Sequence, residues 1–183
     1  MDKKSFLQAG HTPTLLAAFL YFDLAFMVWV LLGPLGIGIA KDLGLSHAEK
    51  GLMVATPVLA GALLRIVMGI LVDRLSPKKA AIIGQVVVIA AMLYAWLVGV
   101  HSYTEVLVLG VFLGVAGSSF AAALPLASRW YPAEHQGTAM GIAGAGNSGT
   151  ALAALFAPGL AAAFGWTNVF GIVLIPLVLV LIA

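Results

Sequence analysis

The sequence predicts an all-α membrane protein, built as a bundle of about six transmembrane helices, from three observations. Of the 183 residues, 62% are hydrophobic and only 9% are charged, whereas soluble domains carry about a quarter charged residues. The hydrophobic residues form long continuous runs, each close to the roughly 20 residues that a helix needs to cross a bilayer. Because the runs do not alternate apolar and polar residues, they exclude a transmembrane β-barrel.

Six apolar runs follow one another along the chain. We expect spans at about 14–39, 50–72, 79–99, 104–127, 138–162 and 167–183. The connections between them are short: Lys41–Glu49, Leu75–Lys78, His101–Tyr103, Ser128–Gly137 and Phe164–Trp166. The first run is too long for the core of a signal peptide, so we expect it to stay as a span. No connection holds a soluble domain, so residues 1–183 are expected to form a single bundle.

The basic residues predict the orientation of the bundle. With the N-terminus in the cytoplasm, most basic residues outside the spans face the cytoplasm: Lys3, Lys4, Arg74, Lys78, Lys79 and Arg129. Only Lys41 and Lys50 then face the other side. The positive-inside rule therefore predicts a multi-pass protein of the cell (inner) membrane with a cytoplasmic N-terminus.

Several classes of function are not expected. The chain has no cysteine, and its four histidines lie near span ends or in connections without metal-ligand spacing, so we expect no metal. It has no phosphate-binding glycine loop and no arrangement of nucleophile and base, so we expect neither ATP coupling nor an enzyme. The net charge of +2 is small and scattered, so nucleic acid is not an expected partner. No cofactor is expected.

Arg65 is the strongest functional signal, because it is a charged residue inside an expected span. It lies eight residues before Asp73, which places it about 12 Å inside the cytoplasmic end of the second span. An arginine at this depth costs about 2.5–3.5 kcal/mol on insertion scales and normally faces the bundle interior or a watery cavity. The alternative, a side chain that reaches back to the headgroups, fits this depth poorly. We expect Gly61 and Gly69, on the same helix face, to leave room around it.

A second signal is the segment 141–149 of the fifth span, which has four glycines in nine residues. Each glycine weakens a helix by about 1 kcal/mol relative to alanine. Close helix packing and the close approach of a ligand to the backbone both explain such a cluster. Asn147 lies within it, and its amide either bonds to a neighbouring helix or donates to an anion.

Two more residues of the expected spans have alternative interpretations. Asp23 lies about ten residues into the first span, where a carboxyl group is neutral, paired with a basic residue or a proton carrier. If the span begins later, Asp23 lies near the membrane interface instead. Phe120 lies in the fourth span beside Ser118 and Ser119, and an aromatic residue there is ordinarily part of the core.

The segment Gly69–Lys79 resembles the loop between the second and third helices of the major facilitator superfamily. The pattern is a glycine, three residues, Asp73 and Arg74, and then a basic pair. Ser76 and Pro77 stand where that superfamily has a glycine and a basic residue. The resemblance implies that the loop holds two halves of a transporter together on the cytoplasmic side and controls gating. Asp73 is then expected to pair with a neighbouring cation or a helix N-terminus.

Other segments are similar to the nitrate/nitrite porter family of that superfamily. They cover nearly the whole chain: Tyr21–Gly36, the mid-span Arg65, the segment around Phe120, Arg129–Gly137 and Gly144–Gly149. The resemblance implies an anion pocket made of Arg65, Phe120, Asn147, Gly144 and Gly146. It implies a gating region made of Gly69, Asp73, Arg74 and Arg129. The aspartate in the first helix is similar to the branch of proton-coupled nitrate uptake, which makes Asp23 a candidate for proton coupling.

The expected function is secondary transport of nitrate or nitrite, by nitrate:proton symport or by nitrate/nitrite antiport. The expected partners are the nitrate or nitrite anion, the lipid bilayer and, for symport, protons. The alternatives are a six-helix membrane scaffold or subunit without transport, and a porter for another small anion. The family binds its substrate between two six-helix halves, so we expect this chain to be the N-terminal half, present as a natural half or a fragment. The C-terminal half or a second copy would then complete it.

Overall fold

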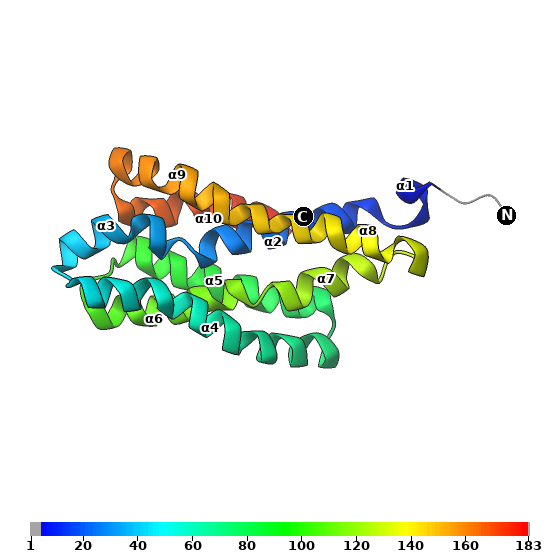
Figure 1. Cartoon of the computed structure of the whole chain (residues 1–183), viewed down its shortest axis with the longest axis horizontal. Coiled ribbons are helices and arrows are strands. Elements are labelled where there is room, and N and C mark those ends of the chain that lie inside the picture. The colour runs from blue at the N-terminus through cyan, green and yellow to red at the C-terminus, as the bar shows by residue number, and fades with distance from the viewer. Residues whose placement is uncertain (1–4, 183) are drawn as a thin grey trace.

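The computed structural model describes residues 5–182, and every element within that range is helical (Figure 1). In chain order the elements are α1 (Phe6–Ala9), α2 (Thr12–Trp29), α3 (Leu32–Leu43), α4 (His47–Arg74), α5 (Pro77–Leu97), α6 (Tyr103–Gly117), α7 (Phe120–Ser128), α8 (Ala133–Gly144), the 3₁₀ helix η1 (Ala145–Ser148), α9 (Gly149–Phe164) and α10 (Trp166–Ile182). The long helices run side by side along the longest axis of the molecule. The all-α fold class expected from the sequence is confirmed.

Five stretches of the described chain are long and apolar enough to cross a membrane: Thr12–Leu43, His47–Arg74, Pro77–Leu97, Tyr103–Ser128 and Ala133–Phe164. The helix α10 is equally apolar but shorter, at 17 residues up to Ile182. The chain is therefore a multi-pass membrane bundle. Its helices begin and end within a few residues of the expected runs, but three of the runs are not single helices.

The breaks have local causes. Pro34 has no N–H for the carbonyl of Val30, and its ring would collide with that carbonyl in a continuous helix, so α2 ends at Trp29 and α3 begins at Leu32. In the fourth run the Ser118 hydroxyl donates to the Val115 carbonyl at 2.6 Å and competes with the helical hydrogen bonds. In the fifth run, the glycine-rich segment tightens into η1.

The helices differ in how much of their surface the bundle covers. The stretches that contain α2 and α6 are mostly buried, whereas α4 and the run from α8 to α9 turn most of their surface outward. One apolar core runs through the half of the bundle that contains α3 and α6, centred on Leu31, Leu32, Met92, Leu113 and Phe170. The outward surfaces of α4 and α9 are therefore available to lipid or to another protein.

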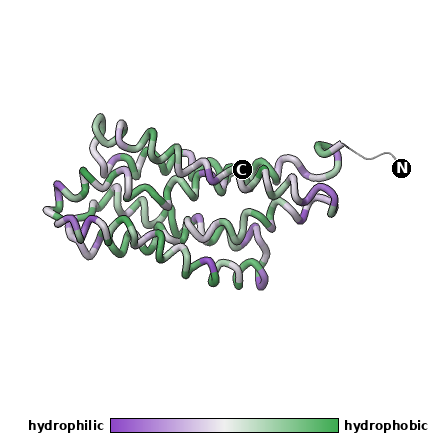
Figure 2. Tube along the Cα trace, in the orientation of Figure 1, coloured by the Kyte–Doolittle hydropathy of each residue, from purple (hydrophilic) through white to green (hydrophobic). Residues whose placement is uncertain are grey.

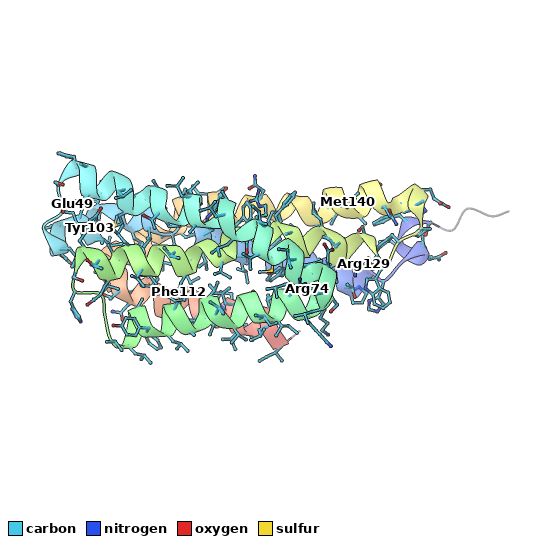
Figure 3. The ribbon with its side chains drawn as sticks, turned by 90° about the horizontal axis from the view of Figure 1, so that it is seen from below. Glu49, Arg74, Tyr103, Phe112, Arg129 and Met140 are labelled. Atoms are coloured by element: carbon cyan, nitrogen blue, oxygen red, sulfur yellow. The ribbon has the colours of Figure 1, made fainter. Side chains whose placement is uncertain are left out.

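The polar residues lie mainly at the two ends of the bundle (Figure 2). Figure 3 shows Arg74 and Arg129 toward one end, and Glu49 and Tyr103 at the opposite end. The N-terminal helix α1 lies at the same end as Arg129. Lys3 and Lys4, which contributed to the predicted orientation, lie outside the described residues.

Candidate functional site

Arg65 lies on α4 and reaches the point where the fourth run breaks. Its Nη2 donates a hydrogen bond to the carbonyl oxygen of Gly117 at 3.2 Å. Its guanidinium carbon lies 5.4 Å from the centroid of the Phe120 ring. Its Nε is buried and has no hydrogen-bond partner within residues 5–182. A buried donor on a cation is costly without an acceptor, so this N–H lacks the partner that a buried donor normally has.

The break between α6 and α7 makes the Gly117 carbonyl available to Arg65. In a continuous helix that oxygen would accept from the amide of Ala121. The Ala121 amide instead donates to the carbonyl of Ser118 at 3.1 Å. The Gly117 oxygen is thus an unpaired carbonyl at a helix end, and the arginine satisfies it. The discontinuity in one helix therefore orients the charged side chain of another.

An aromatic row on α2 continues from Phe120. The rings of Phe22 and Phe120 lie 5.7 Å apart, and those of Phe22 and Phe26 lie 4.2 Å apart. Phe120 is 39% exposed, so one part of its ring contacts the row while another part remains accessible. Sequence reasoning missed the row, although the spacing of Phe22, Phe26 and Trp29 already placed three aromatic residues on one helix face.

Asp23 is buried at the contact between α2 and η1. Its side chain is 6% exposed, and it accepts a hydrogen bond from the Ser148 hydroxyl at 2.6 Å. A Cβ on Gly146 would lie 2.8 Å from the Asp23 amide nitrogen, and one on Gly149 would overlap the Asp23 carbonyl. Asp23 makes no ion pair with Arg65 in the part of the chain that the structure describes. Glycine is therefore required here for close contact between α2 and the broken fifth helix.

The glycine-rich segment has two packed and two open glycines. Gly146 is buried against α2, as is Gly149, whereas a Cβ on Gly141 or Gly144 would meet no atom within 4 Å. Asn147 is exposed on η1. Its side chain makes no hydrogen bond to any residue from 5 to 182. The structure thus brings Arg65 and Phe120 together. Asn147 is exposed and Gly144 has open space beside it, but in the described part of the chain neither forms a hydrogen bond with Arg65.

One expectation about the second span was wrong. Gly61 does not leave room around Arg65, because the indole of Trp29 fills the space beside it, with Nε1 2.7 Å from the position of an added Cβ. A Cβ on Gly69 would indeed meet no atom. Asp73 is exposed and, among the described residues, pairs with no cation. Water already solvates the exposed carboxylate, so an ion pair there would add little to the stability of the protein.

The rest of the expected gating region is also at the surface. Arg74 and Arg129 are both exposed, and Figure 3 shows them toward the same end of the bundle. Arg74 belongs to the last turn of α4, and Arg129 caps the C-terminus of α7, where a positive charge suits the helix dipole. No group of three possible metal ligands occurs within residues 5–182.

Known proteins resemble both the sequence and the fold. The family model of the Major Facilitator Superfamily matches residues 15–183. The "Probable nitrate/nitrite transporter NarK2" of Mycobacterium tuberculosis is 40% identical over 90% of this chain and 42% of its own length. The "Nitrite extrusion protein" of Bacillus subtilis is 36% identical over 78% of this chain and 36% of its own length. The "Probable nitrate/nitrite antiporter NarK1" of Thermus thermophilus is 35% identical over 78% of this chain.

A solved structure has the same fold. It is a bacterial homologue of the human lysosomal transporter Spinster in an inward-facing, unoccupied conformation, with a TM-score of 0.79 and 21% identity. The match covers 99% of this chain and 43% of that one. The chain spans about two fifths of the length of the curated relatives that it matches. The resemblance to nitrate/nitrite porters is confirmed, and the chain belongs to the major facilitator superfamily.

Proposed function

We propose that this chain is the N-terminal half of a secondary transporter for nitrate and nitrite, in which Arg65 binds the anion. The observation that carries the proposal is the state of the Arg65 guanidinium. One arm is anchored on the Gly117 carbonyl, the Nε donor has no acceptor among the described residues, and the Phe120 ring lies beside the cation. A guanidinium that is held in place and still has an N–H without an acceptor is suited to bind an oxyanion.

The chemistry of nitrate fits these groups. Nitrate is flat and carries a single negative charge, so it can lie against an aromatic face and accept hydrogen bonds in its plane from a guanidinium. The exposed amide of Asn147 would supply a further donor, and the open space at Gly144 would let the anion approach the backbone. Gly146 is packed against α2, so we assign it the role of holding the segment that carries Gly144 and Asn147 in place. The names of the curated relatives support nitrate and nitrite over other small anions.

We further propose that a C-terminal six-helix half covers the site. The relatives are more than twice as long as the region that they share with this chain. The outward surfaces of α4 and α9 provide the contact area for a second half. A second copy of the chain is the other candidate for this position, because transporters are commonly built from two related halves.

The coupling and gating roles are part of the same proposal. Asp23 lies about 16 Å along α2 from Thr12, and its hydrogen bond to Ser148 connects it to the broken fifth helix. We propose that Asp23 carries the proton in symport, with nitrate/nitrite antiport as the alternative. Gly69, Asp73, Arg74 and Arg129 form the gating region at the end of the bundle that faces the cytoplasm of the cell. The bundle then lies in the inner membrane with its N-terminus inside.

The test is nitrate binding to the purified chain in detergent, measured by calorimetry with the chain alone and with a separately produced C-terminal half. Arg65→Ala should abolish binding, and Arg65→Lys should weaken it at least tenfold, because a point charge replaces a planar fork. Lys41→Ala removes a positive charge at the far end of the molecule and should leave binding unchanged. Chloride and sulfate serve as competitors, and neither should displace nitrate at equal concentration.

Two other outcomes would replace the proposal. A scaffold without transport predicts no anion binding in either arrangement and full tolerance of Arg65→Lys. A porter for another small anion predicts that chloride, sulfate or an organic anion displaces nitrate.

A further inference from the structure

Trp29 occupies a space between α4 and α6 that two glycines leave open. It is the last residue of α2, and its indole Nε1 donates a hydrogen bond to the Pro57 carbonyl of α4 at 2.7 Å. A Cβ on Gly61 would lie 2.7 Å from Nε1, and a Cβ on Gly117 would overlap the indole ring. The indole therefore contacts the backbone of both neighbouring helices directly.

The same two helices carry the groups of the candidate anion site. Gly117 contacts the Trp29 ring through its Cα, while its carbonyl oxygen accepts the hydrogen bond from Arg65. Gly61 lies four residues before Arg65 on α4, which is about one helical turn away on the same face. A Cβ on Gly114 would lie 2.9 Å from the Gly61 amide nitrogen, so the two backbones are in close contact on the other side as well. A shift of Gly117 or of α4 toward the indole would displace the ring.

We infer that Trp29 is a positioning residue for the anion site, acting through Gly117 and α4 on Arg65. Its hydrogen bond to Pro57 fixes α4 along its axis, and its ring fixes the Gly117 carbonyl that anchors the guanidinium. The Nε donor of Arg65 is thereby held in one direction before a ligand arrives. Trp29 itself does not touch the anion. This inference rests on the proposed function for its effect on binding, but its effect on Arg65 can be measured separately.

The chain offers a matched control in Trp96. Its Nε1 donates to the side-chain oxygen of Asn168 at 3.1 Å, and its ring lies against Gly171 in the same way as Trp29 lies against Gly117. Trp96 belongs to α5 and its partners to α10, so it contacts none of the groups around Arg65. Trp29→Phe and Trp96→Phe each remove one indole N–H donor. Each keeps an aromatic ring packed against the neighbouring glycine.

The experiment uses two measurements on the full chain in detergent. The first is the rate at which phenylglyoxal modifies each arginine, followed by mass spectrometry. The chain has three arginines, and the exposed Arg74 and Arg129 serve as internal references. Trp29→Phe should raise the modification rate of Arg65 about threefold or more relative to these references, because the guanidinium loses its fixed anchor. Trp96→Phe should leave all three rates unchanged.

The second measurement is the dissociation constant of nitrate, by calorimetry. Trp29→Phe should raise it about three- to tenfold, which is the range expected for one lost hydrogen bond, while Trp96→Phe changes it less than twofold. The inference is overturned if Trp29→Phe leaves the Arg65 rate unchanged, or if Trp96→Phe has an equal effect, since the role would then be structural only. If the unmodified chain binds no nitrate, either alone or with a C-terminal half, the proposed function fails. The phenylglyoxal rates still decide whether Trp29 positions Arg65.

Discussion

The Ser148 hydroxyl donates a hydrogen bond to the Asp23 carboxylate at 2.6 Å, across a separation of 125 residues in the chain. This bond joins the middle of α2 to the 3₁₀ turn that interrupts the fifth helix. Gly146 and Gly149 bring the two backbones together on either side of it. The acid of the first span is thus connected to the segment that carries Asn147, rather than to Arg65. A change of the Asp23 side chain is therefore expected to affect the broken helix.

Asp23→Asn tests the proton-carrying role. The amide oxygen of asparagine can still accept from Ser148, so we expect the bundle to stay folded and nitrate affinity to change less than twofold. Because the amide cannot be protonated near neutral pH, stimulation of nitrate uptake by an inward proton gradient should disappear. The measurement is nitrate uptake into proteoliposomes that contain the chain and a C-terminal half. Glu105→Gln, a change of carboxylate to amide at the end of the bundle near Tyr103, is the control and should keep the response to the gradient. If Asp23→Asn also keeps it, Asp23 is not the proton carrier.

Gly149→Ala tests the close contact between the fifth run and α2. An added Cβ overlaps the Asp23 carbonyl, and overpacking of this kind costs about 1–3 kcal/mol. We expect a clear fall in the unfolding temperature in detergent. Gly141→Ala lies in the same glycine-rich segment and faces open space, so its unfolding temperature should be unchanged or slightly higher. Equal effects of the two substitutions would contradict the contact.

Phe120→Leu tests the aromatic face beside Arg65. The leucine keeps the apolar contact with Phe22 but lacks the ring that attracts the guanidinium, an interaction of about 0.5–1 kcal/mol at an accessible site. The dissociation constant of nitrate should therefore rise about two- to fivefold. Phe112→Leu on α6, whose ring is 44% exposed, should leave the constant unchanged. A larger effect of Phe112→Leu than of Phe120→Leu would remove Phe120 from the site.

The sequence predicted the parts of the structure that follow from solvent and periodicity. Long apolar runs determine where helices lie in a membrane, and a mid-span arginine needs a polar partner, so the bundle and the importance of Arg65 could be inferred. The partner itself could not be inferred. The Gly117 carbonyl becomes an acceptor only because the helix breaks beside Ser118, and that break depends on a hydroxyl hydrogen bond that leaves no periodic pattern.

The packing around the glycines could not be inferred from the sequence either. From sequence, Gly61 and Gly69 are equivalent neighbours of Arg65, each four residues away. In the structure the indole of Trp29 fills the space beside Gly61, whereas the space beside Gly69 is open. Nothing local distinguishes them, because the residue that fills the space comes from another helix. For the same reason the glycine-rich segment could not be divided in advance into its packed positions, Gly146 and Gly149, and its open positions, Gly141 and Gly144.

The most direct test of the central claim is the Nε–H signal of Arg65 in nitrogen-15 NMR during a nitrate titration. With arginine labelled, the chain gives three such signals, and loss of one in Arg65→Lys assigns it. The account predicts that nitrate shifts the Arg65 signal with saturation, that chloride does not, and that the signals of Arg74 and Arg129 stay in place. An Arg65 signal that does not move, or three signals that move together, would contradict the claim that this side chain holds the anion.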